Sequence, residues 1–369
     1  MHVIFDGRVM AEQYSGLGRY TGELLFALLD DNVEHKIRYS VIIWEDPNAD
    51  QENSYYSKLK KYQQQGMCRV ISVPCKPISI SQHFKLNKYI KPLKGDLYFY
   101  PHFDLPLGVR LLCISVIHDL SPIKIKEYIS KNRWIKLLYF KFMLRLSVRK
   151  AKYIFAVSET SRQDLLKEVG KRFSDKVGVS LEGPMLKDSK NSKKIDLKLP
   201  KKFLLYVGVR RPHKNVKRML DLFIALKEHL HYSGDLVIVG STKNYDFDVE
   251  AYIKNRTDVH ILGQLDDEKL SQLYKRMDSL LFLSKYEGFG LPVVEAGSFN
   301  KKMILSDGGA LVEVAPPWAF ILPNDPDFNQ YLSKIGDYLK SDIVCNSDYI
   351  KQYTWKSVAD RIRQKFVLK

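Results

Sequence analysis

The chain has 369 residues, of which 45% are hydrophobic and 27% charged, and its four cysteines form no CxxC pair. This composition is typical of a soluble globular protein of about two domains, and it excludes a disordered chain, a collagen-like fibre and a bundle of membrane helices. The net charge of +17 is concentrated in residues 51–150, which carry 19 basic and 5 acidic side chains, whereas residues 201–350 carry 19 and 20. Such a positive first half would attract nucleic acid, an anionic membrane or a phosphorylated substrate. The isolated cysteines and the absence of a signal-peptide pattern at the start predict a cytoplasmic protein without a disulfide framework or zinc site.

Short apolar runs separated by helical patterns recur along the chain. Several runs are hydrophobic throughout, which is typical of parallel strands covered on both faces, and their spacing indicates βαβ units. We therefore predict an α/β protein with two Rossmann-like, doubly wound parallel-sheet domains of about six strands each. The predicted strands are residues 3–5, 37–44, 69–73, 97–100, 112–117, 153–157, 203–207, 236–239, 259–262, 279–283, 303–305 and 320–322.

A polar, lysine-rich stretch at residues 181–202 has no periodicity and is bounded by prolines, which is typical of an exposed linker. The predicted domains are therefore residues 1–185 and 200–350. The end of the chain, residues 352–369, reads as a tryptophan followed by a basic amphipathic helix, which we expect to pack back on the first domain.

The sequence KYEGFGLPVVEAGS at residues 285–298 follows a predicted strand and contains Glu287 and Glu295. A strand that runs into a glycine-rich turn and then a helix exposes backbone N–H groups at the helix start, which is a suitable place for an anion. Pro292 fits the first helical turn. The alternative is an ordinary glycine-bearing loop with two solvated acids.

The sequence YVGVRRPHKNVK at residues 206–217 places Arg210, Arg211 and Lys214 at the carboxyl end of another strand. Guanidinium and ammonium groups at that edge suit a diphosphate. A solvated basic turn at a helix start is the alternative, and taken alone the two interpretations are about equally supported.

Two weaker motifs lie in the first half. Gly16 and Gly18 in YSGLGRY would allow close backbone approach to a phosphate or sugar, although a G-x-G without a third glycine is weak evidence for a dinucleotide. His118 in VIHDLSP ends a predicted strand and could hydrogen-bond a sugar hydroxyl or simply cap its loop. Asp246 and Asp248 form a DxD, which we interpret as helix capping, so no metal is predicted.

Residues 124–152 interleave basic and bulky apolar side chains and lack acids after Glu127. A helix here would be apolar over more than half its circumference. A core-facing helix is the favoured interpretation, and docking on an anionic membrane is the alternative.

Taken in order, these motifs resemble those of the GT-B glycosyltransferases of family 4, which retain anomeric configuration and use nucleotide-sugars. The resemblance spans nearly the whole chain and is closest to bacterial enzymes that build surface polysaccharides with mannosyl or rhamnosyl units. The matching segments are SGLGRYTGELL, VIHDLSP, AVSETSRQDL, YVGVRRPHKN, DLVIVG, HILGQLDDEKLSQLY, YEGFGLPVVEAGS and TWKSVA. The resemblance implies two domains facing across a cleft, with the acceptor on the first and the nucleotide on the second.

The resemblance also implies roles for the acids and the loop of the second domain. Glu295 would hold the ribose hydroxyls, and Glu287 the hydroxyls of the donor sugar. The backbone amides of Phe289, Gly290 and Leu291 would surround the sugar and phosphate.

Charged groups would complete the donor site. Lys214 would neutralise the departing diphosphate. Val209 stands where the family has an arginine, so Arg210 or Arg211 would substitute. Gly16, with Gly18 nearby, would bring a backbone amide to the diphosphate, and His118 would lie beside the donor sugar.

The resemblance implies a retaining hexosyltransferase, with mannose or rhamnose favoured as the sugar, and the residues predict that it needs no metal or other cofactor. The expected partners are a nucleotide-diphosphate sugar, a glycan or polyprenyl-diphosphate-linked acceptor, and the anionic inner face of the cytoplasmic membrane, on which the enzyme would be peripheral. Alternatives are a GT-B enzyme with a small soluble acceptor, a nucleotide-sugar epimerase, a non-catalytic GT-B scaffold and, more remotely, a basic nucleic-acid-binding protein. The last lacks a recognisable DNA- or RNA-binding module, so no nucleic-acid partner is expected.

Overall fold

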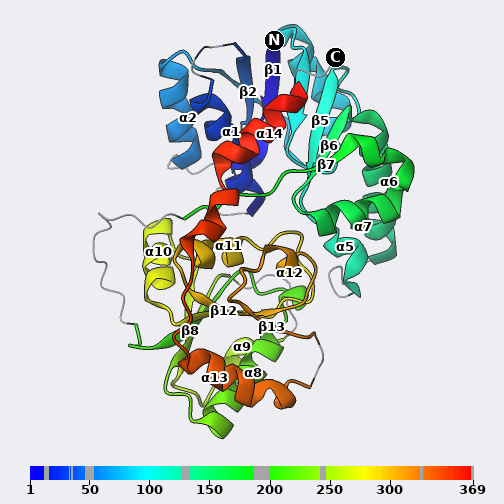
Figure 1. Cartoon of the computed structure of the whole chain (residues 1–369). Coiled ribbons are helices and arrows are strands. Elements are labelled where there is room, and N and C mark those ends of the chain that lie inside the picture. The colour runs from blue at the N-terminus through cyan, green and yellow to red at the C-terminus, as the bar shows by residue number, and fades with distance from the viewer. Residues whose placement is uncertain are drawn as a thin grey trace. The chain divides into compact units, whose positions relative to one another are not determined.

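The chain forms two compact units, each built on its own parallel sheet (Figure 1). The computed structural model describes residues 1–11, 16–32, 34, 36–45, 54–126, 133–186, 199–241, 247–324 and 327–366. Contacts divide the chain into a first unit of Met1–Asp119, Asn132–Glu182 and Thr354–Lys369, and a second unit of Leu120–Lys131 and Gly183–Tyr353.

Within the described residues, the first unit has a seven-stranded sheet in the order β3-β2-β1-β4-β5-β6-β7. Strands β1 and β4 are buried along their whole length, which explains the aromatic run LYFY of β4 and the apolar residues between His2 and Asp6 in β1. The order reverses direction between β1 and β4, and this is the point where doubly wound sheets bind ligands. The strands are β1 (His2–Asp6), β2 (Arg38–Trp44), β3 (Arg69–Val73), β4 (Leu97–Tyr100), β5 (Leu112–Ile117), β6 (Tyr153–Ala156) and β7 (Val177–Val179).

Helices connect these parallel strands, as right-handed crossovers require. Helix α7 shows how the sequence sets a helix start, because the Ser158 hydroxyl accepts from the Ser161 N–H at 2.9 Å. The helices are α1 (Gly16–Asp30), α2 (Ser54–Gln64), α3 (Gln82–Lys85), α4 (Asn87–Ile90), α6 (Arg133–Lys150), α7 (Glu159–Val169) and α14 (Trp355–Phe366).

The second unit has a six-stranded sheet, among the described residues, in the order β10-β9-β8-β11-β12-β13. Its order reverses between β8 and β11. The strands are β8 (Phe203–Val207), β9 (Asp235–Val239), β10 (Val259–Gly263), β11 (Ser279–Phe282), β12 (Lys302–Ser306) and β13 (Phe320–Leu322). The helices are α5 (Ser121–Lys124), α8 (Val216–Leu230), α9 (Val249–Tyr252), α10 (Asp267–Arg276), α11 (Leu291–Ser298), α12 (Leu311–Val314) and α13 (Leu332–Lys340).

The predicted fold class is confirmed, and every predicted strand is present to within two residues at each end. Strand β7 was not predicted, because its three residues VGV follow a polar stretch and give too short an apolar run. The predicted extent of the first domain, residues 1–185, differs from the first unit at the segment Leu120–Lys131, which groups with the second unit. Residues 187–198 of the predicted linker lie outside the described residues.

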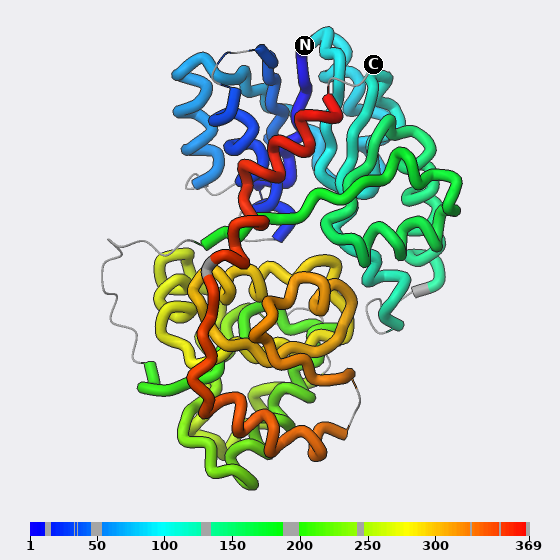
Figure 2. Tube along the Cα trace, viewed as in Figure 1, coloured from blue at the N-terminus to red at the C-terminus, as the bar shows by residue number. Residues whose placement is uncertain are grey.

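Helix α14 belongs to the first unit and packs on α1, so the two ends of the chain share one core (Figures 1 and 2). The Trp355 ring lies edge-on to Tyr20 at 5.5 Å between centroids. The Lys356 ammonium and the Arg363 guanidinium both pair with Asp31 at the end of α1. Ile362 is fully buried on the inner face of α14.

Helix α6 has one buried face, formed by Phe140, Met143, Leu144 and Val148, so the core-facing interpretation holds for that face. Its opposite face exposes large apolar side chains. None of the helices in the described ranges is long and apolar enough to cross a bilayer.

We predict that Ile362→Ala lowers the free energy of unfolding by about 3 kcal/mol, because it leaves a cavity between α14 and the rest of the first unit. Arg361→Ala, an exposed neighbour on the same helix, is the matched control and should change it by less than about 0.5 kcal/mol. Urea unfolding followed by circular dichroism measures both. Equal effects of the two variants would contradict the packing of α14.

Candidate functional site

The loops that follow β8 and β11 carry most of the predicted donor-site residues of the second unit. Residues 208–214 follow β8 and residues 283–290 follow β11. The two strands are neighbours at the point where the sheet order reverses, so both loops leave the same carboxyl edge. The backbone N–H of Lys285 donates to the His213 carbonyl at 2.7 Å and joins the two loops directly.

An ion pair between Lys214 and Glu287 forms the centre of this site. The Lys214 ammonium lies 2.6 Å from Oε1 and 2.8 Å from Oε2 of Glu287. The lysine side chain is 18% exposed and that of Glu287 12%, so the pair is largely shielded yet reachable from solvent. A short 3₁₀ turn at Pro212–Lys214 presents the lysine, whose ammonium also lies 5.4 Å from the centre of the Phe282 ring. The structure thus brings together two residues that are 73 positions apart in the sequence.

Helix α11 begins immediately after Glu287 and its glycine turn. Gly290 is the N-cap with φ +116°, a left-handed conformation that favours glycine, and a Cβ there would lie 2.9 Å from Leu311 Cδ2. Leu291 opens the helix, and Pro292 occupies its first turn, as expected from the sequence. Phe289 is buried with its ring centre 5.9 Å from that of Tyr353, so any contact it makes with a ligand would be through its backbone.

Glu295 lies on the buried face of α11, one turn into the helix. It is only 4% exposed, and its Oε2 accepts a hydrogen bond from the Tyr274 hydroxyl at 2.7 Å. The Tyr274 ring stacks on Phe299 and is itself fully buried. The two acids of the motif therefore have different surroundings, since Glu287 pairs with a lysine and Glu295 with a tyrosine.

The two arginines after Gly208 also have different surroundings. The Arg210 guanidinium is buried and donates to Glu250 at 2.7 Å, and its backbone N–H binds the Ser241 carbonyl. Arg211 is partly exposed at the start of the 3₁₀ turn that carries Lys214. Its charge acts on His213, as do those of Lys214 and Glu287. Arg211 thus lies at the start of the turn that carries Lys214, whereas the Arg210 guanidinium pairs with Glu250.

His213 was not singled out from the sequence, although it lies inside the basic motif. It is 5% exposed, and burial together with the charges of Lys214 and Arg211 lowers its pKa to about 4. The buried imidazole is therefore neutral at neutral pH. The position of His213 directly before Lys214 was the signal by which the sequence could have identified it.

A glycine pair after β12 was also missed. The Ala310 N–H donates to the Glu287 carbonyl at 2.9 Å, and a Cβ on Gly309, which has φ +65°, would lie 2.4 Å from that same oxygen. Only glycine allows this approach, which fixes the backbone of Glu287. The signal was the sequence SDGGA directly after a predicted strand.

His118 and the glycines of α1 lie in the first unit. The His118 Nδ1 lies 3.1 Å from Glu182 Oε1, and its Nε2 lies 3.1 Å from the Pro101 carbonyl. The ring meets that of Tyr20 edge-on at 4.5 Å, which brings α1 beside the end of β5. Gly16 is exposed at the first position of α1, with open space where a Cβ would stand, and Gly18 is buried. Tyr14 and Ser15 of this motif lie outside the described residues.

The DxD motif is only partly described. The Asp248 carboxylate accepts from the Ala251 N–H at 2.9 Å as the N-cap of α9, which confirms the capping interpretation for this residue. Asp246 lies outside the described residues.

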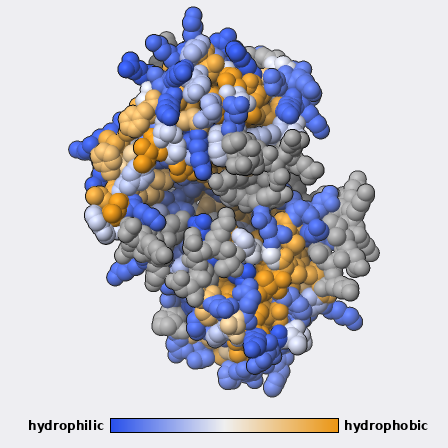
Figure 3. All heavy atoms as spheres, turned by 180° about the vertical axis from the view of Figure 1, so that it is seen from behind, coloured by the Kyte–Doolittle hydropathy of each residue, from blue (hydrophilic) through white to orange (hydrophobic). Residues whose placement is uncertain are grey.

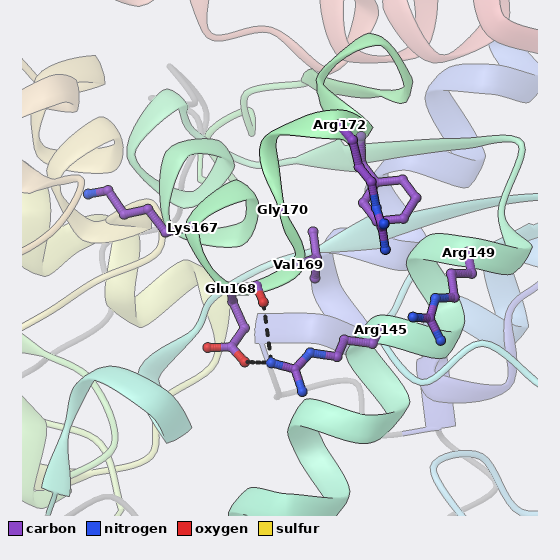
Figure 4. Close-up of a pocket in the computed structure, with 8 residues that line it drawn as sticks. Arg145, Arg149, Lys167, Glu168, Val169, Gly170 and Arg172 are labelled. Carbon is purple, nitrogen blue, oxygen red and sulfur yellow. Dashed lines mark hydrogen bonds and ion pairs between the residues drawn. The ribbon is translucent and has the colours of Figure 1, made fainter.

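A basic pocket of about 410 Å³ lies between α6, α7 and the 3₁₀ turn Lys171–Lys176 in the first unit (Figure 4). Figure 4 shows the Arg145 side chain directed at Glu168, to which it donates at 2.9 Å, while Lys167 points away from the arginines. The lining carries four basic side chains and one acid, so the pocket is electropositive. Its lining residues are Arg145, Arg149, Lys167, Glu168, Val169, Gly170, Arg172 and Phe173.

Comparisons with known proteins identify the class of this enzyme. Residues 187–357 match the family described as glycosyl transferases group 1. The chain is 27% identical to the O-antigen chain mannosyltransferase RfbU of Salmonella typhimurium over 265 residues, which are 71% of this chain and 70% of that protein. It is 25% identical to the O-antigen chain mannosyltransferase B of Escherichia coli over 346 residues, 89% of this chain and 88% of that protein.

Solved structures share the fold along the whole chain. Sucrose-phosphate synthase from Thermosynechococcus elongatus has a TM-score of 0.72 at 16% identity, covering 99% of this chain and 98% of that one. Anabaena HepE, solved in complex with UDP and glucose, has a TM-score of 0.66 at 16% identity with the same coverage.

The fold and the family match define a glycosyltransferase of the GT-B type, as the sequence motifs predicted. Within that class the chain is similar to bacterial O-antigen mannosyltransferases.

We predict that His213 makes the stability of the enzyme depend on pH. Its pKa in the folded protein, about 4, lies below the usual 6.5, so the unfolded chain binds the proton more readily between these values. The contribution of His213 to stability is therefore complete above pH 6.5 and is lost as the pH falls toward 4. Between pH 7 and pH 5 the free energy of unfolding of the native protein should therefore fall by about 2 kcal/mol more than that of His213→Gln.

Urea unfolding of both proteins at pH 7 and pH 5 measures this difference. His229→Gln, at an exposed position on α8, is the control and should keep the pH dependence of the native chain. An unchanged pH dependence in His213→Gln would contradict the buried neutral imidazole.

Proposed function

We propose that this glycosyltransferase moves a hexose, with mannose or rhamnose favoured, from a nucleotide-diphosphate sugar to a glycan or lipid-linked glycan acceptor. The configuration at the anomeric carbon is retained, and no metal ion takes part. The observation that carries the proposal is the shielded Lys214–Glu287 pair at the point where the strand order of the second sheet reverses.

The pair is suited to exchanging partners when a donor binds. A diphosphate beside Lys214 would share the ammonium charge now compensated by Glu287. The carboxylate would then be able to accept hydrogen bonds from sugar hydroxyls. A positive group fixed where negative charge develops on the leaving diphosphate lowers the barrier to bond cleavage.

Three further elements of the second unit would support the donor. We assign the second diphosphate contact to Arg211 and not to Arg210, because Arg210 is buried against Glu250. The start of α11, with the backbone amides of Gly290 and Leu291, offers a dipole for the phosphate. Glu295 would hold the ribose once its hydrogen bond with Tyr274 is shared.

The first unit would bind the acceptor and make additional contacts with the donor. Gly16, exposed at the start of α1, is free of side-chain obstruction and would offer its backbone to the diphosphate, with Gly18 allowing close packing behind it. His118 would contact the donor sugar through a ring nitrogen now turned to Glu182 or Pro101.

The transfer balances without a further reagent. The bond between the anomeric carbon and the β-phosphate oxygen breaks, and the acceptor oxygen bonds to the same face of that carbon. The acceptor proton passes to the departing diphosphate, which gains the electron pair of the broken bond. Positive groups and a helix N-terminus supply the charge compensation for which other enzymes use a metal ion.

The sugar and acceptor classes rest on the relatives. RfbU and the mannosyltransferase B are both named as O-antigen chain mannosyltransferases, which favours mannose and a growing surface polysaccharide. HepE in complex with UDP and glucose supports a nucleotide and a hexose as ligands of this fold.

We further propose that the enzyme binds the anionic inner face of the cytoplasmic membrane through α6. Trp134, Leu138 and Phe142 lie one helical turn apart and are 71%, 64% and 56% exposed. The same stripe continues as Arg145 and Arg149. Figure 3 shows apolar side chains gathered among hydrophilic ones on this edge of the first unit.

This apolar-then-basic stripe has the chemistry of a helix lying in a membrane interface. Exposed aromatic and aliphatic side chains enter the acyl boundary, and neighbouring cations attract anionic headgroups. The basic pocket at the end of α6 would receive a headgroup phosphate between Arg149 and Arg172. The polyprenyl diphosphate of a lipid-linked acceptor is held at the same surface.

We predict that Lys214→Ala and Glu287→Gln each lower the rate of sugar release from the preferred donor by about a hundred- to a thousand-fold. The assay presents GDP-mannose, dTDP-rhamnose and UDP-glucose without acceptor and measures slow hydrolysis, then repeats the measurement with EDTA. Chelation should leave the rate unchanged, and proton NMR of a transfer product should show the anomeric configuration of the donor.

Lys227→Ala is the matched control for Lys214. Its side chain is 22% exposed and pairs with Asp258 at 3.5 Å near the opposite end of α8. It should keep the rate within about twofold. Full activity of Lys214→Ala, or loss of activity on chelation, would contradict the proposed donor chemistry.

For the membrane, we predict that the native enzyme floats with vesicles that contain phosphatidylglycerol at low salt and is released by about 0.5 M salt. The double variant Leu138→Ser and Phe142→Ser should bind about tenfold less at low salt, because it removes apolar surface from the helix face. Val344→Ser removes a side chain that is 87% exposed in the second unit and should bind like the native enzyme. Binding that is absent for the native enzyme, or equal in all three proteins, would exclude this surface.

A further inference from the structure

A buried polar network lies where the strand order of the first sheet reverses, between β1 and β4. None of the motifs in the sequence analysis includes it. Asp6 ends β1, and the Arg8 guanidinium binds both of its carboxylate oxygens, with Nη2 at 2.7 Å from Oδ2. The hydroxyl of Tyr98, on the neighbouring strand β4, donates to the same carboxylate. Each of these three side chains is at most 1% exposed.

The network continues from Arg8 to the loop after β4. Arg8 Nη2 donates to Gln82 Oε1 at 3.0 Å, and Gln82 Nε2 donates to Asp104 Oδ2 at 2.8 Å. The Tyr100 hydroxyl donates to Asp104 Oδ1 at 2.9 Å. Gln82, Tyr100 and Asp104 are at most 2% exposed. Desolvating so many polar groups is costly, so a network of this size is expected where it orients a functional group.

That group is His102, at the end of the network. Its Nδ1 lies 2.5 Å from Asp104 Oδ1, and because a carboxylate oxygen accepts, Nδ1 carries the hydrogen. The Ser115 hydroxyl donates to the His102 carbonyl at 2.5 Å and fixes the backbone. The ring is 16% exposed, and Nε2 makes no hydrogen bond to any residue within the described ranges. The other nitrogen is thus held as a hydrogen-bond acceptor in a fixed orientation.

Aromatic side chains lie around the His102 ring. The Phe103 ring lies 4.6 Å from that of His102 and is half-buried, and Phe140 of α6 supports it from behind at 4.4 Å. Tyr139 of α6 is 40% exposed, and partial burial together with the Asp104 charge raises its pKa. A fixed acceptor beside aromatic surface is the combination that recognises the hydroxyls and the apolar face of a pyranose.

We propose that His102, with Phe103, forms the subsite that holds a sugar residue of the acceptor, a hydroxyl of which donates to Nε2. The proposal rests on the proposed transferase function and adds to it the acceptor-binding residue. Asp104 acts through His102 as a positioning residue. The network lies at the carboxyl edge of the sheet, where the strand order reverses between the paired strands β1 and β4, and this is the ligand position of doubly wound sheets.

The first test is binding, and it needs no turnover. The enzyme with ¹⁵N-labelled histidine is titrated with the methyl glycosides of mannose, rhamnose, galactose and N-acetylglucosamine. Long-range ¹H–¹⁵N spectra should show His102 with hydrogen on Nδ1 and an Nε2 resonance that shifts with at least one glycoside. No shift with any of the four, or an equal shift of His260, would overturn the subsite.

The second test is kinetic and uses His102→Asn, which preserves a donor to Asp104 but removes Nε2. With the preferred nucleotide-sugar and the octyl glycosides of the same four sugars, the acceptor KM should rise about tenfold. Hydrolysis of the donor without acceptor should stay within about twofold. His260→Asn is the matched control, since His260 also pairs with an aspartate, Asp235, at 2.7 Å but at the amino edge of the second sheet.

The outcomes separate this proposal from the function itself. An unchanged acceptor KM in His102→Asn overturns the subsite, and so does a parallel loss of donor hydrolysis, which would assign the network to folding alone. If the native enzyme neither hydrolyses nor transfers any sugar, the proposed function fails, and the binding experiment decides the subsite by itself.

Discussion

The ion pair between Lys214 and Glu287 is the interaction on which the second unit's site depends. Two loops from adjacent strands meet there, and each is stabilised by the other: one carries the cation, and the other an acid whose backbone is fixed by Gly309. The charge of this shielded lysine is compensated by the neighbouring carboxylate. In the proposed function a diphosphate would take the place of the acid, so that the same lysine would serve both the empty and the loaded site.

Most of the fold could be predicted from the sequence because its strands are of the simplest kind. Runs such as FLLYV in β8 and LYFY in β4 are covered on both faces and leave little ambiguity about period or length. Strand β7 shows the limit, since three residues VGV have no pattern to detect. The extent of the first unit was harder, because contacts and not composition place Leu120–Lys131 with the second unit.

The candidate site was predictable where motif and strand end coincide, as at Lys214 and Glu287. What the sequence could not supply was the partner of each side chain. Two adjacent arginines look alike, yet the buried Arg210 guanidinium pairs with Glu250 of helix α9. His102 closely follows β4 in the sequence, but nothing in the sequence shows that Asp104 orients its ring. That contact and the buried hydrogen bonds behind it are visible only in the tertiary structure.

The return of α14 to the first unit has a consequence for biosynthesis. Helix α1 is made within the first thirty residues of the chain, but the helix that covers it comes from the last fifteen. The apolar face of α1 that α14 covers therefore stays exposed while the second unit is synthesised. The amino-terminal unit therefore cannot complete its core until α14 has been synthesised, and a chain truncated before Trp355 would expose the apolar face of α1 that this helix covers.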